Sequence, residues 1–484
     1  MTPFTAPAPP RRRRLRFVVI ALGLVALAAA AVAGWLVYRH ARIGWQLRDA
    51  IAELDAADPR WRLEQIEADR AKVPDAENSS PVIRHARALL GRPPLYAYQL
   101  RDELLRGLTP EVRLTDAQYA GLIDVLEDAE AGVGPALALV RYPRGRHPIT
   151  YAADGVSTLL RHADDMSSVH WRVLEPLTLV LAHEGDAAGA LTACHATLNL
   201  GRSIGDEPFA VSQLVRARYS RSAVRGLERV LGQGEAPADV LAVLQAELAA
   251  EADYDPWDVV LRGERAVSFQ VMEALQTGVL KPSMFRALAR TTPGAAARRS
   301  EMDKAREWLA DRFGVDTRAA LAWRLRHMTR LKDAGRLPWP ERRAAVAALA
   351  EEEADAPELA RPLLWLTENF ITAVQAAQAR CRCAAVAIAV ELYRLRHGRW
   401  PDSLAALVPD FLPAAPLDPL DGRPLRYKRL AHGVAVYSVG PDGADDGGHF
   451  VDDQSWPAGT DVGVRLWDVN HRGRRRAAAP GGPP

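Results

Sequence analysis

The sequence predicts a mainly α protein with an N-terminal transmembrane helix, a large irregular α-helical body and a small C-terminal α+β module. An uninterrupted apolar run from Phe17 to Tyr38, amphipathic helical patterning through the long middle of the chain, and β-type runs confined to residues after 424 predict this class. The expected parts are a basic tail at 1–16, the membrane helix at 17–38, the body at 44–360, the module at 361–470 and a disordered tail at 471–484.

Composition narrows the functional classes. The chain has 484 residues, enough for two or three domains, with 48% apolar and 25% charged residues, which is ordinary for a globular protein. A net charge of +2 provides no strong field for nucleic acid, so we expect no nucleic-acid partner. Three cysteines are too few for a disulfide framework. Cys381 and Cys383 face different sides of a helix, while a bond from Cys194 to either remains open.

The apolar run sets the compartment. Its 22 residues form a helix of about 33 Å, which spans a bilayer core. Five arginines between Arg11 and Arg16 precede it, and Trp35 and Tyr38 stand at its far end. This charge bias puts the N-terminus in the cytoplasm and the body on the exoplasmic (periplasmic) side. We therefore predict a single-pass protein of the inner membrane.

A cleaved secretory signal is the competing interpretation of the same segment. Ala31-Val32-Ala33 before Gly34 fits a small-residue cleavage site. The apolar core of such a signal would be long, and apolar residues continue past the cut, so an anchor is favoured. Both interpretations export the body.

The middle of the chain is patterned for helices with short breaks. One apolar stripe begins at Trp45 and ends before Asp58-Pro59, and Ser80-Pro81 is typical of an N-cap followed by a first-turn proline. Two helices flank the turn at Glu184-Gly185-Asp186, and Pro338-Trp339-Pro340 breaks the chain again. No fixed period recurs, which predicts an irregular helical array instead of a solenoid.

Catalytic motifs are scarce. His183 and His195 lack the i, i+4 spacing of a zinc-protease helix, and the acidic cluster that follows His162 is typical of a solvated helix end. The sequence contains no nucleophile elbow, phosphate-cradling loop or dinucleotide fingerprint. We therefore predict no catalytic residue and a protein that is not an enzyme.

The C-terminal module begins with a long helix. Helical patterning covers Leu363–Leu395, and Ala384–Val390 is apolar nearly all round, which predicts burial on two sides. Gly398 suits the left-handed position after the last turn, and Pro401 prevents continuation. A short helix is expected over 402–408.

Three β-type runs follow. Leu425–Tyr427 and Val434–Ser438 flank a turn near His432-Gly433 and indicate a hairpin, and Val462–Trp467 completes a three-stranded antiparallel sheet. A helix packed on three strands is about the minimum that buries a sheet face.

Several of these residues carry a family resemblance. Tyr393, the Gly398–Pro401 corner, Asp418-Pro419, Gly422 and the Tyr437–Gly443 segment resemble the C-terminal domain of the major pseudopilin of type II secretion systems, over residues 391–468. The resemblance implies the same helix-then-sheet fold. It also implies a calcium-binding loop after the second strand, for which Asp442 fits the motif and Asp445, Asp446 and Asp461 follow by proximity. A plain Asp/Gly-rich surface loop is the alternative.

The chain departs from the family in its N-terminal half. About 350 residues separate the apolar run from the module, and the run contains no glutamate. A pseudopilin places its hydrophobic helix directly before this domain. The chain is therefore not expected to polymerise as a pilus subunit.

These observations predict a membrane-anchored exoplasmic binding or scaffold protein of the cell envelope. The resemblance suggests envelope or secretion-system proteins as partners, through association with a type II secretion or pilus-like assembly, and calcium as its cofactor. An exported hydrolase with its site in the helical body is the alternative, and a receptor that binds a small ligand between helices is a third. The sequence does not predict an oligomeric state.

Overall fold

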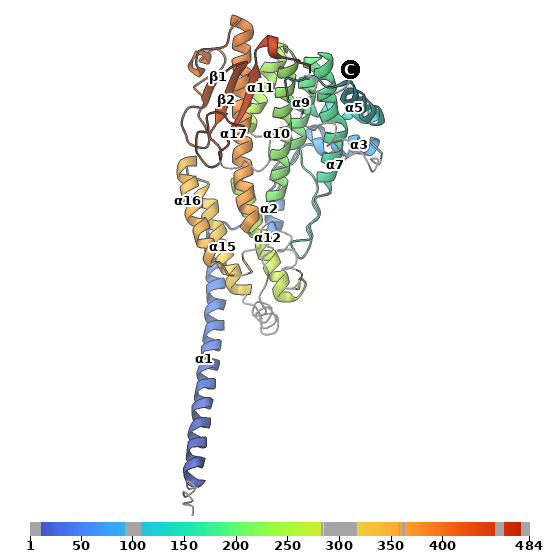
Figure 1. Cartoon of the computed structure of the whole chain (residues 1–484). Coiled ribbons are helices and arrows are strands. Elements are labelled where there is room, and N and C mark those ends of the chain that lie inside the picture. Colours follow the sequence, from blue (N-terminus) through green and yellow to red (C-terminus); the bar gives the residue numbers. More distant parts are fainter. Residues whose placement is uncertain are drawn as a thin grey trace, which may run out of the picture.

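The computed structural model describes residues 11–91, 108–281, 284, 317–357, 359–360, 364–450 and 459–475. The chain is mainly helical, with one three-stranded antiparallel sheet, as the sequence predicted. Figure 1 shows a long N-terminal helix that extends as an arm from a body of packed helices, with the sheet at the far end.

The arm is α1 (Arg11–Ala57), a single helix of 47 residues. The apolar side chains of residues 17–35 and of Val37 and Tyr38 are exposed, and within the described residues it is the one helix long and apolar enough to cross a membrane. Its last turns are different, because Ile43, Ala50 and Leu54 are buried and the helix packs on α15 (Thr317–Ala334). The sequence pattern separated the membrane run from the stripe that begins at Trp45, whereas the structure joins them without a break.

The remaining helices of the body are mostly short. They are α2 (Leu63–Asp69), α3 (Ser79–Leu89), α5 (Asp116–Asp128), α6 (Glu130–Leu137), α7 (Arg161–Val169), α8 (Glu175–Glu184), α9 (Ala187–Arg202), α10 (Ala210–Gln233), α11 (Ala238–Ala252), α12 (Trp257–Thr277) and α16 (Trp339–Glu352), with single turns at Asp75–Glu77, Ala138–Arg141, Glu353–Asp355 and Val469–His471 and a π-helical stretch, η3 (His170–Leu174), between α7 and α8.

Local chemistry explains several of their ends. Gly185 has a φ of 90°, a left-handed conformation that ends α8 and allows α9 to start two residues later. The cap of α3 differs from the prediction. Asn78, not Ser80, is the N-cap residue, and its Oδ1 accepts a hydrogen bond of 3.1 Å from the backbone N–H of Ser80.

The C-terminal module has the predicted order of elements. α17 (Leu364–His397) is followed by the short helix η6 (Leu404–Leu407) and by strands β1 (Arg426–Leu430), β2 (Gly433–Ser438) and β3 (Val462–Trp467). The sheet has the antiparallel order β1-β2-β3. β3 has the predicted bounds, whereas β1 continues three residues further than expected, because Leu430 still pairs with Gly433 across the hairpin turn.

Residues that carried the family resemblance hold the corners of this module. The Asp418 carboxylate is buried and accepts hydrogen bonds from the backbone N–H groups of Leu420 and Val439, at 2.8 and 2.9 Å, and from the Ser438 hydroxyl at 2.7 Å. The indole N–H of Trp400 donates to Asp468 at 2.6 Å. These bonds fix the turns on either side of the sheet.

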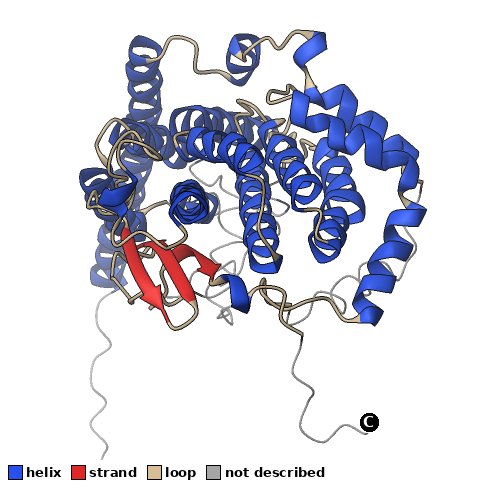
Figure 2. Cartoon of the chain, turned by 90° about the horizontal axis from the view of Figure 1, so that it is seen from above, coloured by secondary structure: helices blue, strands red, loops and turns tan. Residues whose placement is uncertain are grey.

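The module and the helical body share one hydrophobic core. Val434, Val436, Val464 and Leu466 pack with the apolar stretch 384–390 of α17, and the same cluster continues into α9, α10 and α11. Figure 2 shows the sheet lying against one side of the array of helices. The boundary predicted near residue 361 therefore does not separate two cores.

Polar contacts also join the two parts. The backbone N–H of Arg465 on the outer edge of β3 donates to Glu228 Oε1 of α10 at 3.0 Å, so a helix covers the open edge of the sheet. Beyond the sheet, Gly473 N–H donates to the Gly232 carbonyl at 2.9 Å, and Arg474 exchanges backbone hydrogen bonds with 111–113. The chain is thus ordered through 475, where a disordered tail was predicted, and 476–484 lie outside the described residues.

Candidate functional site

A cavity of about 360 Å³, which we call the junction pocket, lies between the helical body and the C-terminal module. One wall is a face of α10, formed by Ser222, Arg225, Gly226 and Arg229, which are spaced three and four residues apart. The opposite wall includes Gly463, Arg465 and Trp467, which alternate along β3 and therefore share one face of that strand. The remaining wall comes from 108–111, η3, α8, α9 and α17.

The pocket is rich in charge. Four arginines and three glutamates line it: Arg225, Arg229, Arg380 and Arg465, with Glu111, Glu175 and Glu228. Glu228 is engaged on both oxygens, because Oε2 accepts from Arg380 Nη2 at 3.1 Å and Oε1 accepts from the backbone of Arg465. The lining therefore carries a net positive charge.

Arg229 is the most buried cation of this lining, with 3% of its surface exposed. Its Nη1 donates to the carbonyl oxygens of Thr109 and Val112, at 2.8 and 2.5 Å. Within the described residues, its Nε and Nη2 have no hydrogen-bond partner, and Glu111 acts on it through charge without a hydrogen bond. Burial lowers the pKa of Arg229 to about 10, which still leaves the guanidinium charged at neutral pH.

Arg465 supplies a second cation from the other wall. Its guanidinium carbon lies 4.9 Å from the centroid of the Phe450 ring, and its buried Nε has no hydrogen-bond partner in the described part of the chain. Gly463 permits this arrangement, because a Cβ at that position would stand 2.5 Å from Phe450 Cζ. The aromatic ring can therefore lie directly over β3.

The 108–112 segment is held against the C-terminal end of α10. Gln233 Nε2 donates to the Pro110 carbonyl at 2.6 Å, beside the bonds from Arg229. Gly232 allows this close approach, since a Cβ there would lie 2.6 Å from the same carbonyl oxygen. The 108–112 segment and the guanidinium of Arg229 thus hold each other in place.

Cys194 also lines the junction pocket but is not poised for catalysis. It is buried, and burial raises its pKa to about 12, so the side chain is a thiol at neutral pH instead of a reactive thiolate. The hydroxyls of Thr178 and Thr197 donate to the carbonyls of Leu174 and Ala193 in their own helices, at 2.7 and 2.9 Å. These groups shape the cavity.

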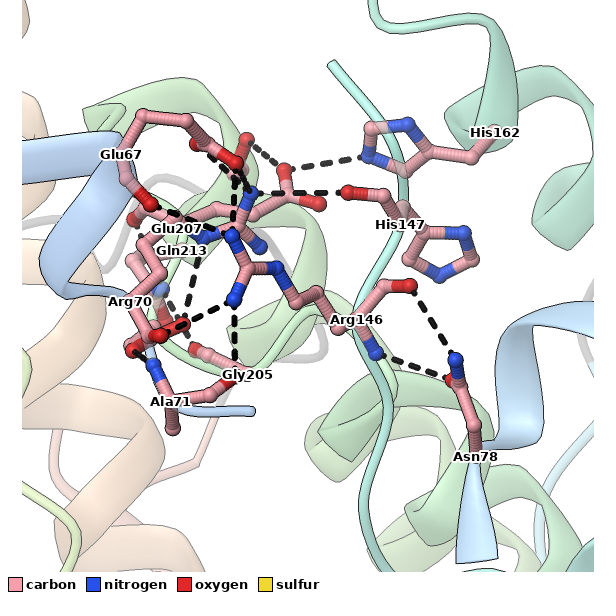
Figure 3. Close-up of polar contacts among 12 residues, drawn as sticks. Glu67, Arg70, Ala71, Asn78, Arg146, His147, His162, Gly205, Glu207 and Gln213 are labelled. Carbon is pink, nitrogen blue, oxygen red and sulfur yellow. Dashed lines mark hydrogen bonds and ion pairs between the residues drawn. The ribbon is translucent and has the colours of Figure 1, made fainter. Parts of the chain in front are cut away.

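A second polar cluster, around His162 and Glu207, lies inside the body (Figure 3). His162 Nε2 is 3.1 Å from Glu207 Oε2, His147 Nε2 is 3.0 Å from Ser203 Oγ, and the two imidazole rings stack at 4.3 Å. All four residues are buried, whereas Asp164, in the acidic cluster that follows His162, is exposed, as expected for a solvated helix end. Burial lowers the pKa of His147 well below its ordinary value, which favours a neutral ring.

The rest of this cluster joins distant segments. Arg146 Nη1 donates to the Arg70 carbonyl at 2.9 Å and its Nη2 donates to Glu67 at 3.0 Å, while its backbone N–H donates to Asn78 at 3.0 Å. Figure 3 shows these residues converging from separate elements. The network is a structural one that fastens α2, α3 and α7 to the start of α10.

The histidine pair considered in the sequence does not form a described metal site. His183 packs on Tyr119, with ring centroids 5.0 Å apart, and His195 is largely buried in α9. Among the residues that the structure describes, no three His, Cys, Asp or Glu side chains gather to hold a metal.

The four predicted calcium ligands lie in the loops after β2 and before β3, where they mostly accept backbone hydrogen bonds. Asp442 accepts from Ala444 and Gly459 at 3.0 and 2.9 Å, and Asp445 accepts from Gly447 at 3.0 Å. The Asp461 carboxylate accepts from the backbone of Asp446 and Gly448, at 3.3 and 2.7 Å.

Within the described residues, one carboxylate oxygen of this loop stands out. Asp446 Oδ2 is buried with no hydrogen-bond partner among the described atoms, and Asp445 and Asp446 repel the charge on Asp461. Burial is the larger cause of the raised pKa of Asp461. Asp442 and Asp461 each accept backbone hydrogen bonds on both oxygens, and Asp445 lies 3.7 Å from Arg426, so among the described residues Asp446 Oδ2 is the loop oxygen left for a hard cation. Asp452 and Asp453, further along the loop, lie outside the described residues.

Comparison with family models, with curated proteins and with solved structures finds no match for this chain.

Proposed function

We propose that this protein is a membrane-anchored binding protein of the cell envelope, with its body on the exoplasmic side. The continuity of α1 carries the proposal. Its exposed apolar segment and its buried last turns belong to one helix, so the membrane segment is joined directly to the folded body. The long apolar run, which continues past Ala31-Val32-Ala33, favours an anchor over a cleaved signal.

The C-terminal module is the proposed contact to a type II secretion or pilus-like assembly. Two observations support this role: the resemblance of 391–468 to the major pseudopilin, and the helix-then-sheet order of α17 and β1–β3 that this resemblance implies. Calcium is the proposed cofactor of the loop that contains Asp442, supported by the unpaired oxygen of Asp446.

Thiol labelling of intact cells tests the anchoring and the orientation. The three native cysteines are buried and give little background. Asp402→Cys places a thiol at a side chain that is 85% exposed in the module, and Thr5→Cys places one before the membrane segment. We expect a membrane-impermeant maleimide, admitted through a permeabilised outer membrane, to label the first variant and to reach the second only after lysis.

Fractionation and mass spectrometry complete the test. The full chain should stay in the membrane after carbonate extraction and keep the residues before Gly34, and a chain lacking 1–38 should be soluble. A mature N-terminus at Gly34 would contradict the anchor, and labelling of Thr5→Cys in intact cells would contradict the orientation.

A further inference from the structure

We propose that the junction pocket binds a small organic anion, with its carboxylate or phosphate group held by Arg229 and Arg465. This site does not depend on the side of the membrane or on a secretion partner. It is formed by the contact between the helical body and the C-terminal module, so neither part holds it alone.

The charge of the pocket is the first reason to expect an anionic ligand. A buried guanidinium without a carboxylate partner is costly, and the carbonyl oxygens around Arg229 Nη1 offset only part of that cost. Arg229 therefore keeps two nitrogens for which the described chain supplies no acceptor. An anion bound in the pocket would balance this uncompensated charge.

The arrangement of the acidic residues supports the same ligand charge. Glu228, one of the three lining carboxylates, is already bound by Arg380 and by the Arg465 backbone, and the charge of Glu111 offsets part of that on Arg229. The Arg465 guanidinium contacts the Phe450 ring and forms no ion pair within the described residues. Two cations on opposite walls are thus left to face a ligand.

Size and lining define the rest of the ligand. About 360 Å³ lies in the range of pockets that hold small molecules. Phe450, Trp467, Leu108 and Leu179 add apolar surface to the charged walls. A molecule with one anionic group and a compact aromatic or aliphatic part matches this combination, and guanidinium forks suit carboxylate and phosphate equally.

Isothermal titration of the full chain in a non-ionic detergent tests the proposal with three probes. Phenyl phosphate and benzoate carry the two candidate groups on the same ring, and benzyl alcohol is the neutral control. We expect saturable binding of one molecule per chain for at least one anion and none for benzyl alcohol. The anion that binds more tightly identifies the preferred group.

Two variants connect this binding to the pocket. Arg465→Gln should raise the dissociation constant by about 10- to 100-fold, because a charge-assisted bond to the anion is lost. The backbone contact of residue 465 to Glu228 remains. Phe450→Leu, which keeps the arginines, should raise the dissociation constant by about 2- to 10-fold. Arg336→Gln removes a guanidinium whose side chain is 75% exposed, outside the pocket lining, and should change nothing.

Two results would contradict the proposal. The proposal is overturned if neither anion gives saturable heat with the wild-type chain. It is overturned as well if Arg465→Gln and Phe450→Leu, both folded by circular dichroism, bind as tightly as Arg336→Gln.

Discussion

Glu391 illustrates how single residues hold the last part of the chain against α17. It is fully buried on α17, and Arg472 donates to both of its oxygens at 2.8 and 2.9 Å. Arg394 adds bonds of 3.0 and 2.7 Å. Burial by itself would raise the pKa of Glu391, but the hydrogen bonds and charges of the two arginines outweigh it, so the pKa lies below its ordinary value.

We expect Glu391→Ala to lower the free energy of unfolding by about 3–5 kcal/mol at neutral pH, because it leaves buried arginine charge unpaired. A carboxyl with a depressed folded pKa stabilises above its unfolded pKa, and this contribution is lost as the pH falls through the folded value. The difference between wild type and variant should therefore shrink below about pH 4. Denaturant unfolding at several pH values measures it.

Glu352→Ala is the matched control for this variant. Glu352 pairs with Arg330 at 2.6 Å on the surface, where both side chains are nearly half exposed. Solvent screens such a pair, so its loss should have little effect. An equally small effect of Glu391→Ala would contradict the role assigned to the buried cluster.

At the scale of the element, β3 shows how the fold protects a sheet edge. The strand pairs with β2 on one side and is covered by α10 on the other, where Glu228 accepts the Arg465 N–H group. The same strand presents Gly463, Arg465 and Trp467 to the junction pocket. β3 is therefore both the protected edge of the sheet and part of the candidate binding surface.

The loop after β2 is the element on which the calcium proposal can be measured. We expect calcium at a hundred times its dissociation constant to stabilise the full chain by about 2.7 kcal/mol relative to excess chelator, and magnesium to do less. Asp446→Asn should abolish the calcium-dependent rise of the unfolding midpoint, because Asp446 Oδ2 is the unpaired oxygen.

Asp442→Ala separates metal binding from loop structure in this experiment. Asp442 already accepts two backbone N–H groups, so its loss should lower the midpoint in chelator as well. An identical midpoint in calcium and chelator for the wild-type chain would leave the loop as a plain acidic turn.

At the scale of the whole molecule, the body and the module are expected to unfold as one unit. They share a hydrophobic core across α9, α10, α11, α17 and the sheet, and the chain returns to the body through residues 472–474. Calorimetry of the full chain in detergent should therefore show a single transition for these elements. Hydrogen exchange should give similar protection in α10 and α17, and two separated transitions would contradict a common core.

The sequence by itself determined the elements whose signals are local. The apolar run within α1, the glycine ends of α8 and α17, and the β-type residues of β2 and β3 are local signals, and the helical run, the two helix ends and the two strands form where they were predicted. The helix-then-sheet order of the module was predictable for the same reason.

Only the tertiary structure decided which distant residues meet. The regular spacing of Ser222, Arg225 and Arg229, and of Gly463 and Arg465, was present in the sequence, but periodicity does not say which two faces oppose each other. The sequence indicated only a solvated acidic cluster after His162, and tertiary packing places His162 itself beside Glu207. Burial and charge pairing depend on contacts between segments far apart in the chain, and those contacts create the junction pocket.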